Sequence, residues 1–265
     1  MAIGRSWMPK THKSFKIVKS SKLRFRFKIF ALTGLILAFL VIAAYFSYDP
    51  ASNFYGNVFK SIITKDKVIA LTFDDGPNGE TTLKVLDILK QEDVKATFFV
   101  VGDNVKFYPA IAKKIATDGN EIENHSTHHA HSLQFETEYA IYKDLTETNQ
   151  IIYAHTGQMP RFYRPPFGFR SPWAFGAARA AKLITVTWND LTQDYSAKSD
   201  SVIVSYIEKF ARPGGVIVLH DGSGAKHGVD HPNMLKALPQ IIENLKAKGY
   251  KFVTVSELYD RSYAK

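Results

Sequence analysis

The stretch VIALTFDDGPN, residues 68–78, decides how this chain folds. Residues 68–73 form a mostly apolar run of strand length, which indicates a buried strand rather than a typical helix. Asp74 and Asp75 end the run, and a Gly-Pro-Asn-Gly sequence at 76–79 then breaks the chain into a loop. Taken alone, these residues are an Asp-rich turn. A buried strand that delivers paired acids is also how an α/β enzyme places chemistry at the mouth of a sheet or barrel.

Short strand-like runs alternate with helical patterns from residue 67 onward. This alternation predicts an α/β fold with a parallel sheet or barrel. The expected strands are residues 68–73, 96–101, 121–124, 162–164, 183–187, 216–219 and 252–255. The main expected helices are residues 81–92, 136–156 and 235–246, with Pro239 in the first turn of the last.

Composition bounds the class of protein. The chain has 265 residues, enough for one substantial domain with its own core. It has no cysteine, which excludes disulfides, thiolate metal sites and thiol nucleophiles. The formal net charge is +9, but residues 1–28 hold nine of the 34 Lys and Arg and no acid, which leaves 25 basic and 25 acidic residues elsewhere. The basic balance belongs to this tail and no basic-aromatic stripe appears later in the chain, so the composition does not favour a nucleic-acid partner.

Residues 29–46, IFALTGLILAFLVIAAYF, carry no charge. A run of this length is about the minimum that crosses a hydrocarbon core at 1.5 Å per residue. A helix in a soluble core would show a polar face. The basic residues before the run, and Asp49 as the first acid after it, predict a cytoplasmic tail at 1–28 and an extracytoplasmic remainder. We therefore expect a single-pass anchor in the cell membrane, with a cleaved signal peptide as the alternative.

Residues 47–66 connect this run to the first strand. Apolar residues recur there every four positions in two series, Phe54, Val58 and Ile62, and Tyr55, Phe59 and Ile63. This spacing predicts a helix with one apolar face. The face could rest on a membrane surface or pack on the domain, and the sequence leaves both open.

The segment EIENHSTHHAH, residues 121–131, places four histidines within seven residues directly after an expected strand. A single histidine is usually an ordinary polar residue. A cluster of this density beside an acid-bearing strand favours a metal site. His125 and His129, four apart, together with one carboxylate would make a three-ligand site with open positions for water and substrate, as a catalytic metal requires.

Two later segments carry candidate charged groups. In RFYRPPFGFR, residues 161–170, Arg164 ends a short strand and two prolines stiffen the chain directly after it. Arg164 is either a solvated residue in a rigid turn or a fixed cation that pairs with a carboxylate and lowers its pKa. In WNDLTQDY, residues 188–195, Asp190 and Asp194 could be capping acids.

The segment GGVIVLHDG, residues 214–222, delivers His220 and Asp221 at the end of a buried strand. Five expected strands therefore end in, or lead to, polar residues, and in a parallel barrel those ends share one face. These residues are Asp74 with Asp75, His125, Arg164, Asp194 and His220.

TFDDGP, NHSTHH, RPPFG, WNDLTQDY and VLHDG, in this order, resemble the five motifs of the polysaccharide deacetylases (the NodB-homology domain, family 4 carbohydrate esterases). The similarity covers about residues 66–260, and the chain is similar to membrane-anchored peptidoglycan N-acetylglucosamine deacetylases. The resemblance implies a deformed (β/α)7 barrel over residues 67–260 and metal-dependent removal of N- or O-acetyl groups from polysaccharides. It implies a divalent metal, with zinc first and cobalt, nickel, manganese or iron as alternatives.

The resemblance also implies roles, position by position in the motifs. The implied metal ligands are Asp75, His125 and His129. The implied catalytic set is Asp74 as general base, Arg164 orienting it, His220 as general acid and Asp194 holding His220. The implied substrate contacts are the backbone N–H near Phe167, for the oxyanion, and Trp188 and Val218, for the acetyl methyl group.

The chain departs from the family pattern at a few positions. Leu191 and Tyr195 stand where an acid and a tryptophan are common, Phe167 where tyrosine is common and Glu123 where glycine is common. His128 and His131 are additional, and His128 could compete with His129 as a ligand.

The substrate we expect is an envelope polysaccharide, first the N-acetylglucosamine of peptidoglycan, with another exported or lipid-linked glycan as the alternative. A silent glycan-binding protein on the same fold is a second hypothesis. An iron oxygenase with two histidines and one carboxylate is a third, which the barrel pattern and His220 disfavour.

Overall fold

The computed structural model describes residues 17–50 and 52–263. The chain divides into two compact units, Met1–Phe46 and Ser47–Lys265. Most of the basic tail lies outside the described residues.

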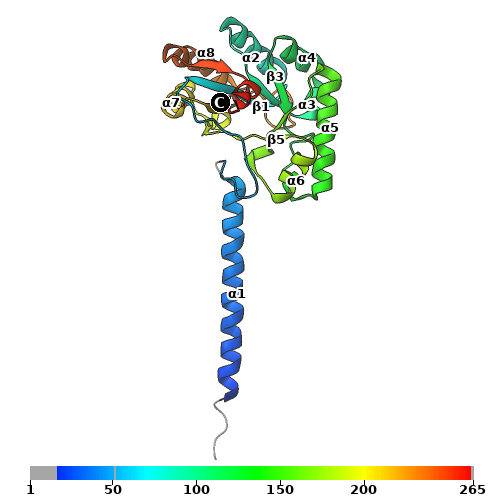
Figure 1. The fold of residues 1–265 in the computed structure, drawn as a ribbon, viewed down its shortest axis with the longest axis vertical. Coiled ribbons are helices and arrows are strands. Elements are labelled where there is room, and N and C mark those ends of the chain that lie inside the picture. Colours follow the sequence, from blue (N-terminus) through cyan, green and yellow to red (C-terminus); the bar gives the residue numbers. More distant parts are fainter. Residues whose placement is uncertain (1–16, 51, 264–265) are drawn as a thin grey trace, which may run out of the picture. The chain divides into compact units, whose positions relative to one another are not determined.

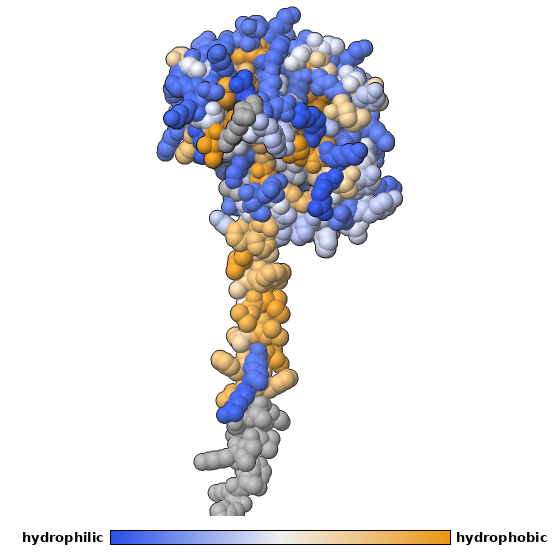
Figure 2. All heavy atoms as spheres, viewed as in Figure 1, coloured by the Kyte–Doolittle hydropathy of each residue, from blue (hydrophilic) through white to orange (hydrophobic). Residues whose placement is uncertain are grey.

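Helix α1 (Ile17–Tyr48) contains the apolar run (Figure 2). Its part from Leu23 to Tyr48 is long and apolar enough to cross a membrane. The helix begins before the expected span of 29–46, because Lys and Arg are good helix formers and continue it toward the N-terminus. A membrane anchor and a signal sequence both have this length and composition.

The unit Ser47–Lys265 is built on one parallel sheet with helices around it (Figure 1). The strand order is β5-β4-β3-β2-β1-β7-β6, and β8 pairs with the first part of β1. The strands are β1 (Val68–Gly76), β2 (Thr97–Val100), β3 (Glu121–Asn124), β4 (Phe162–Tyr163), β5 (Ile184–Thr185), β6 (Asp190–Leu191), β7 (Gly215–His220) and β8 (Lys251–Val253). This curled half-barrel confirms the expected fold class. Strand β6 was not predicted, since two residues are too short to show a period.

The helices follow the strands in an alternating order. They are α2 (Gly79–Gln91), α3 (Gly102–Phe107), α4 (Pro109–Thr117), α5 (Glu138–Thr156), α6 (Pro172–Ala180), α7 (Asp200–Phe210), α8 (Pro232–Ala247) and α9 (Val255–Arg261). The prediction for Pro239 was wrong, because it lies inside α8 and Pro232 occupies the first turn. Proline suits that first position, where its missing N–H would have no partner within the helix.

Strand β1 is the centre of the core, and all nine of its residues are buried. Its side chains alternate between two apolar clusters. Ile69 and Phe73 pack with side chains of α2, α4, α7 and α8. Val68 and Ala70 point to the other face, where they pack with residues of β2, β4, β7 and β8. Each buried side chain of this size contributes about 1.5–3 kcal/mol, so the sheet is held from both faces.

The described residues of the segment 47–66 beyond the end of α1, 49–50 and 52–66, contain no helix, and the prediction of one was wrong. Instead, Phe59 forms a parallel bridge with Val186 and Ser61 an antiparallel bridge with Gly215. Phe59 packs against Phe162 with ring centroids 6.4 Å apart. The segment therefore links the edge strand β5 to the start of β7 and pairs backbone groups that an open edge would expose. The four-residue spacing did not reveal this, because extended chain can bury the same residues.

Candidate active site

The carboxyl ends of the strands surround a cavity of about 620 Å³. Asp74, Asp75, His125, His129, Trp188 and His220 all line it. They come from segments up to 146 positions apart, counting from Asp74 to His220, yet Asp74 and His220 are direct neighbours in the register of β1 and β7. Parallel strands bring these ends to one edge, as the sequence predicted.

The end of β1 separates its two acids. Asp74 continues the alternation of the face that carries Ala70 and Thr72. Asp75 has φ of 72°, a left-handed conformation that non-glycine residues rarely adopt, and the pairing with β2 shifts register here. Gly76 must lack a side chain, because a Cβ atom would lie 2.4 Å from Asp221 Oδ2. The two carboxylates consequently have different surroundings.

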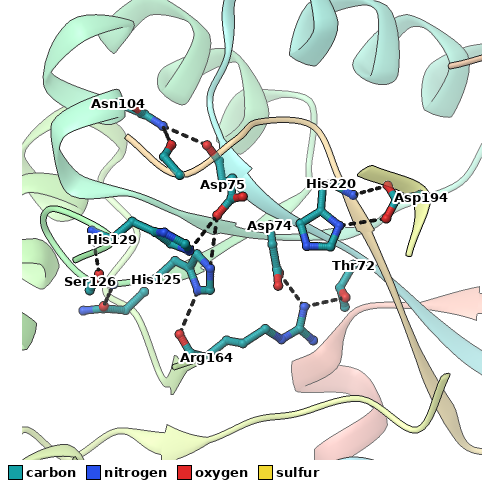
Figure 3. A network of polar contacts seen from close by, with 12 residues as sticks. Thr72, Asp74, Asp75, Asn104, His125, Ser126, His129, Arg164, Asp194 and His220 are labelled. Carbon is teal, nitrogen blue, oxygen red and sulfur yellow. Dashed lines mark hydrogen bonds and ion pairs between the residues drawn. The ribbon is translucent and has the colours of Figure 1, made fainter. Parts of the chain in front are cut away.

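Asp75 faces two imidazoles (Figure 3). Its Oδ1 lies 3.3 Å from Nε2 of His125 and 3.1 Å from Nε2 of His129. His125 Nδ1 donates to the Arg164 carbonyl at 2.7 Å, which leaves a lone pair on Nε2 for a ligand. Asp75 Oδ1 is buried and accepts no hydrogen bond from the described residues. One carboxylate and two imidazoles whose ligand atoms lie within 4.8 Å of one another are a donor set that fits a divalent metal.

Electrostatics favour the charged form of Asp75. Burial alone would raise the pKa of this carboxyl, but the imidazoles of His125 and His129 outweigh burial and hold the pKa well below its usual range. The carboxylate is thus favoured over the carboxylic acid, and the carboxylate is the form of Asp75 that binds a cation.

The loop after β3 decides which histidine joins the group. Asn124 Oδ1 accepts from the Ser126 N–H at 2.9 Å, and Ser126 Oγ accepts from the His129 N–H at 3.1 Å. These bonds direct His129 to Asp75. His128 points elsewhere, with Nδ1 2.6 Å from Asp103 Oδ2. The spacing of histidines alone left this choice open.

Asp74 is paired with a buried arginine. Arg164 Nη1 lies 2.5 Å from Asp74 Oδ1 and donates to Thr72 Oγ1 at 2.8 Å. The guanidinium also stacks over the Phe99 ring, with its central carbon 4.0 Å from the centroid. Burial lowers the pKa of Arg164 and Asp74 partly restores it, and the group stays charged, because an arginine does not deprotonate in proteins. Thr72 was not predicted, although it lies two residues before Asp74 on the same strand face.

On the other side of Asp74, His220 is held by Asp194 (Figure 3). His220 Nδ1 lies 2.8 Å from Asp194 Oδ1, and its backbone N–H donates to Oδ2 at 2.8 Å. Thr192 Oγ1 donates to the same carboxylate at 3.1 Å. Burial alone would lower the pKa of His220, but the Asp194 carboxylate outweighs burial and raises the pKa to about 9. Asp194 is thus an acceptor for the imidazole rather than a helix cap.

The predicted substrate contacts take different places. Phe167 and Trp188 line the cavity, whereas Val218 is fully buried and is not part of its lining. Phe167 has φ of 59° and is 45% exposed. The side chains of Asp190 and Leu191 lie outside the described part of the chain, so that departure from the motif has no structural account.

Three buried polar residues around the site were not assigned from the sequence. Asn104 donates to the backbone carbonyls of Asp75 and Gly224, at 2.8 and 2.9 Å. Asn78 donates to the Asp221 carbonyl at 3.1 Å. Asp221, which burial gives a pKa raised to about 7, accepts from Thr82 Oγ1. The available signal was their position, because each follows a strand at the edge that carries the site.

Glu123 has a structural role outside the cavity. Its Oε2 accepts from the backbone N–H groups of Arg161 and Phe162, at 2.9 and 2.7 Å. Burial, with the nearby Glu121, raises the pKa of Glu123 well above its usual range. It supports the start of β4 and does not line the cavity.

Known proteins are similar to this chain in sequence and fold. A family model described as polysaccharide deacetylase matches residues 61–186. The peptidoglycan-N-acetylglucosamine deacetylase of Bacillus cereus is 34% identical over 205 residues, which cover 77% of this chain and 93% of that protein. The chain belongs to the polysaccharide deacetylase family. The resemblance of the five motifs is confirmed, and with it the class of enzyme.

Two further relatives of this polysaccharide deacetylase bear on its substrate and activity. The peptidoglycan-N-acetylmuramic acid deacetylase PdaA of Bacillus subtilis is 35% identical over 199 residues, 74% of this chain and 72% of that protein. The crystal structure of a CE4 family pseudoenzyme from Bacillus anthracis matches with a TM-score of 0.69 and 29% identity, covering 76% of this chain and 68% of that one.

Proposed function

We propose that this polysaccharide deacetylase is a metal-dependent hydrolase of N-acetyl groups on an envelope glycan, first the N-acetylglucosamine residues of peptidoglycan. The proposal rests on one observation. The residues that could hold a metal line the same cavity as the Asp74 carboxylate, which is paired with Arg164, and the His220 imidazole, which is paired with Asp194. The named activities of the relatives support the choice of substrate.

Asp75, His125 and His129 would hold the metal, since their donor atoms converge and Asp75 Oδ1 has no described hydrogen-bond donor. A divalent cation there polarises an amide carbonyl and makes a water molecule acidic enough to lose a proton near neutral pH. Zinc is our first choice, and cobalt, nickel, manganese and iron also accept this donor set.

Asp74 would be the general base. It lines the cavity beside the metal ligands but is not one of them, so its carboxylate remains available for a proton. Arg164 fixes Asp74 Oδ1 at 2.5 Å, and Thr72 in turn orients the guanidinium. The other carboxylate oxygen can accept a proton from the attacking water while the first stays paired.

His220 would be the general acid that protonates the leaving nitrogen. The Asp194 carboxylate occupies Nδ1, so the proton on Nε2 is the one available to the cavity. With a pKa raised to about 9, the imidazole is protonated at neutral pH. An amine must be protonated as it leaves, and His220 and Asp74 therefore work on opposite ends of the same bond.

The substrate contacts complete the proposal. The structure records no acceptor among the described residues for the Phe167 N–H, so this donor could bind the developing oxyanion. Trp188 would cover the acetyl methyl group, and Val218 would support the cavity from below.

For the N-terminal part we propose a cytoplasmic tail at 1–28, a retained anchor at 29–46 and an extracytoplasmic enzyme. The length and composition of α1 and the basic residues before its apolar run support this arrangement. Peptidoglycan lies outside the cell membrane, where the catalytic unit would then face it.

A silent glycan-binding protein is the second candidate. The likeness to a CE4 family pseudoenzyme favours it, and the intact Asp74–Arg164 and His220–Asp194 pairs argue against it.

The test uses the full chain in detergent, stripped of metal and reloaded with zinc or cobalt. Free acetate released from peptidoglycan and from N-acetylglucosamine oligomers is measured for the wild type and for Asp74→Asn. We expect metal-dependent release that falls at least about a hundredfold in the variant while metal content stays equal. Full activity in Asp74→Asn would refute the proposed base, and glycan binding without acetate would favour the silent protein.

A further inference from the structure

We propose that Lys226 is a specificity-determining residue that binds a carboxylate on the sugar next to the one that is deacetylated. The ligand class is an anionic glycan, in contrast to a neutral polymer of N-acetylated sugars. The inference deepens the proposed function and rests on it for the position of the reacting sugar.

Lys226 belongs to the rim loop, residues 222–229, which follows β7 and borders the cavity. Two asparagines fix this loop on either side of Lys226. Asn104 donates to the Gly224 carbonyl at 2.9 Å, and Asn78 Oδ1 accepts from the Gly228 N–H at 2.6 Å. The ring of His227 also stacks on Phe107 with centroids 3.9 Å apart. The backbone of Lys226 is therefore held at a defined place.

The same asparagines tie the rim loop to the reaction centre. Asn104 also donates to the carbonyl of the metal-ligand candidate Asp75, and Asn78 to the carbonyl of Asp221, next to His220. The distance from Lys226 to the reacting sugar is thus set by the fold rather than by a mobile loop. A fixed spacing of this kind is what recognition of a neighbouring sugar requires.

The Lys226 ammonium has no partner in the described part of the chain. The residue is exposed and lines the cavity, and no described carboxylate lies within ion-pair distance of its nitrogen. Its backbone N–H, by contrast, is engaged with the Ser223 carbonyl at 3.3 Å. The structure fixes the backbone and leaves the charge available for a ligand.

The acids of the cavity do not neutralise Lys226, because each has its own cation. Asp74 is paired with Arg164 and Asp194 with His220. Asp75 faces the two imidazoles and, in the proposed enzyme, a divalent metal. With these acids paired, the Lys226 ammonium adds a positive charge at the rim of the cavity, which attracts an anionic group and not a neutral one.

Peptidoglycan offers such a group beside a neutral N-acetyl sugar. Every second sugar carries a lactyl ether, and its carboxyl group is either free or extended by a peptide with its own carboxylates. A polymer of N-acetylglucosamine alone would leave the Lys226 ammonium hydrated. Discrimination between the two would come from one charge-assisted hydrogen bond.

The experiment compares three substrates with the metal-loaded full chain. They are peptidoglycan strands stripped of peptides, which carry free lactyl carboxylates, the same strands with these carboxylates amidated, and neutral N-acetylglucosamine oligomers. The variants are Lys226→Gln, Lys226→Arg and a matched control, Lys90→Gln, at an exposed lysine of α2 that does not line the cavity.

We expect Lys226→Gln to raise KM for the carboxylate strands about fivefold, the size of a partly exposed charge pair, with kcat within about twofold. KM for the amidated strands and the oligomers should not change, and Lys226→Arg should restore the wild-type value. Lys90→Gln should leave KM unchanged for all three substrates. An equal rise in KM on all substrates would mean a damaged loop and would overturn the proposal, as would no rise on the carboxylate strands.

Binding separates this inference from the proposed function. The affinity of each strand is measured calorimetrically in Asp74→Asn, which is not expected to turn over. If the wild type releases no acetate but Lys226→Gln selectively weakens the carboxylate strands, the role of Lys226 stands and deacetylation fails. If acetate is released but the carboxylate strands and the amidated strands bind with equal affinity, deacetylation stands and the role of Lys226 fails.

Discussion

Two histidine–aspartate pairs lie close to one cavity and have opposite surroundings. His220 and Asp194 are joined at 2.8 Å, and the Asp194 side chain is fully buried. His128 and Asp103 are joined at 2.6 Å, but the His128 side chain is 60% exposed and Asp103 also faces Lys106. The shorter contact therefore belongs to the more exposed pair, whereas the proposed mechanism uses the buried one. Burial and fixed neighbours, rather than the contact itself, make such a pair useful, because water screens an exposed charge.

The largest expected effect concerns the two adjacent histidines. His129→Ala should lose bound metal and activity together, because it removes one of the three donors of the proposed metal site. His128→Ala should keep the metal content of the wild type, since its imidazole binds Asp103. Metal content by atomic spectroscopy after dialysis decides this, and the reverse result would place His128 among the ligands.

Replacing the aspartate of each histidine–aspartate pair should give the next largest difference between the two pairs. Asp194→Asn should lower kcat about 10²- to 10⁴-fold, because the imidazole loses the partner that keeps it protonated and oriented. Asp103→Asn should change kcat less than about twofold, the size of an exposed pair. Acetate release on one substrate measures both, with circular dichroism as the control for folding. Similar losses in the two variants would mean that burial does not distinguish the pairs.

The same contrast holds for the two arginine pairs that flank β4, and it should appear in stability. Arg164→Met leaves the buried Asp74 without its cation and should cost about 3–5 kcal/mol. Arg161→Met breaks an exposed pair with Asp260 and should cost about 0–1 kcal/mol. Urea unfolding of metal-free protein gives both values. Metal-free protein is used so that the binding energy of the metal does not contribute to the measured stabilities. Equal costs for the two variants would contradict the contrast between the buried and the exposed pair.

The smallest effect is a shift in pH dependence. Activity should fall as the pH rises through about 9, where His220 loses its proton. Its folded pKa is raised above the ordinary value of about 6.5, so the stability it contributes is fully present below about pH 6.5 and is lost through about pH 9. In Asp194→Asn, the fall of kcat at alkaline pH (the alkaline limb) should occur at lower pH. Burial lowers the pKa of His220, and the Asp194 carboxylate would no longer oppose it. The charges of Asp74 and Asp75 also face His220 and favour its proton.

The control for that shift is Asp103→Asn, whose alkaline limb should coincide with that of the wild type. A limb that stays at the same pH in Asp194→Asn would assign it to another group. The melting temperatures supply a second measurement, because the difference between wild type and Asp194→Asn should be larger at about pH 6 than at about pH 10.

The sequence by itself determined the parts of this protein that depend on local pattern. The apolar run before Asp74 and Asp75 predicted β1, and β3 was predicted with the bounds that the structure has. The five motifs indicate the family without reference to the fold. Such signals are readable because strand periods, turn residues and adjacent polar groups are properties of neighbouring positions.

Only the tertiary structure decided which groups meet. It selected His129 over His128 through Asn124 and Ser126, and it brought Thr72 to Arg164 and Asn104 to Asp75. It turned residues 59–61 from an expected helix into extended chain bridged to Val186 and Gly215. These outcomes depend on registers and hydrogen bonds between distant segments, and one sequence carries no local sign of them. The sequence alone assigns no role to Lys226, which the fold places beside the cavity.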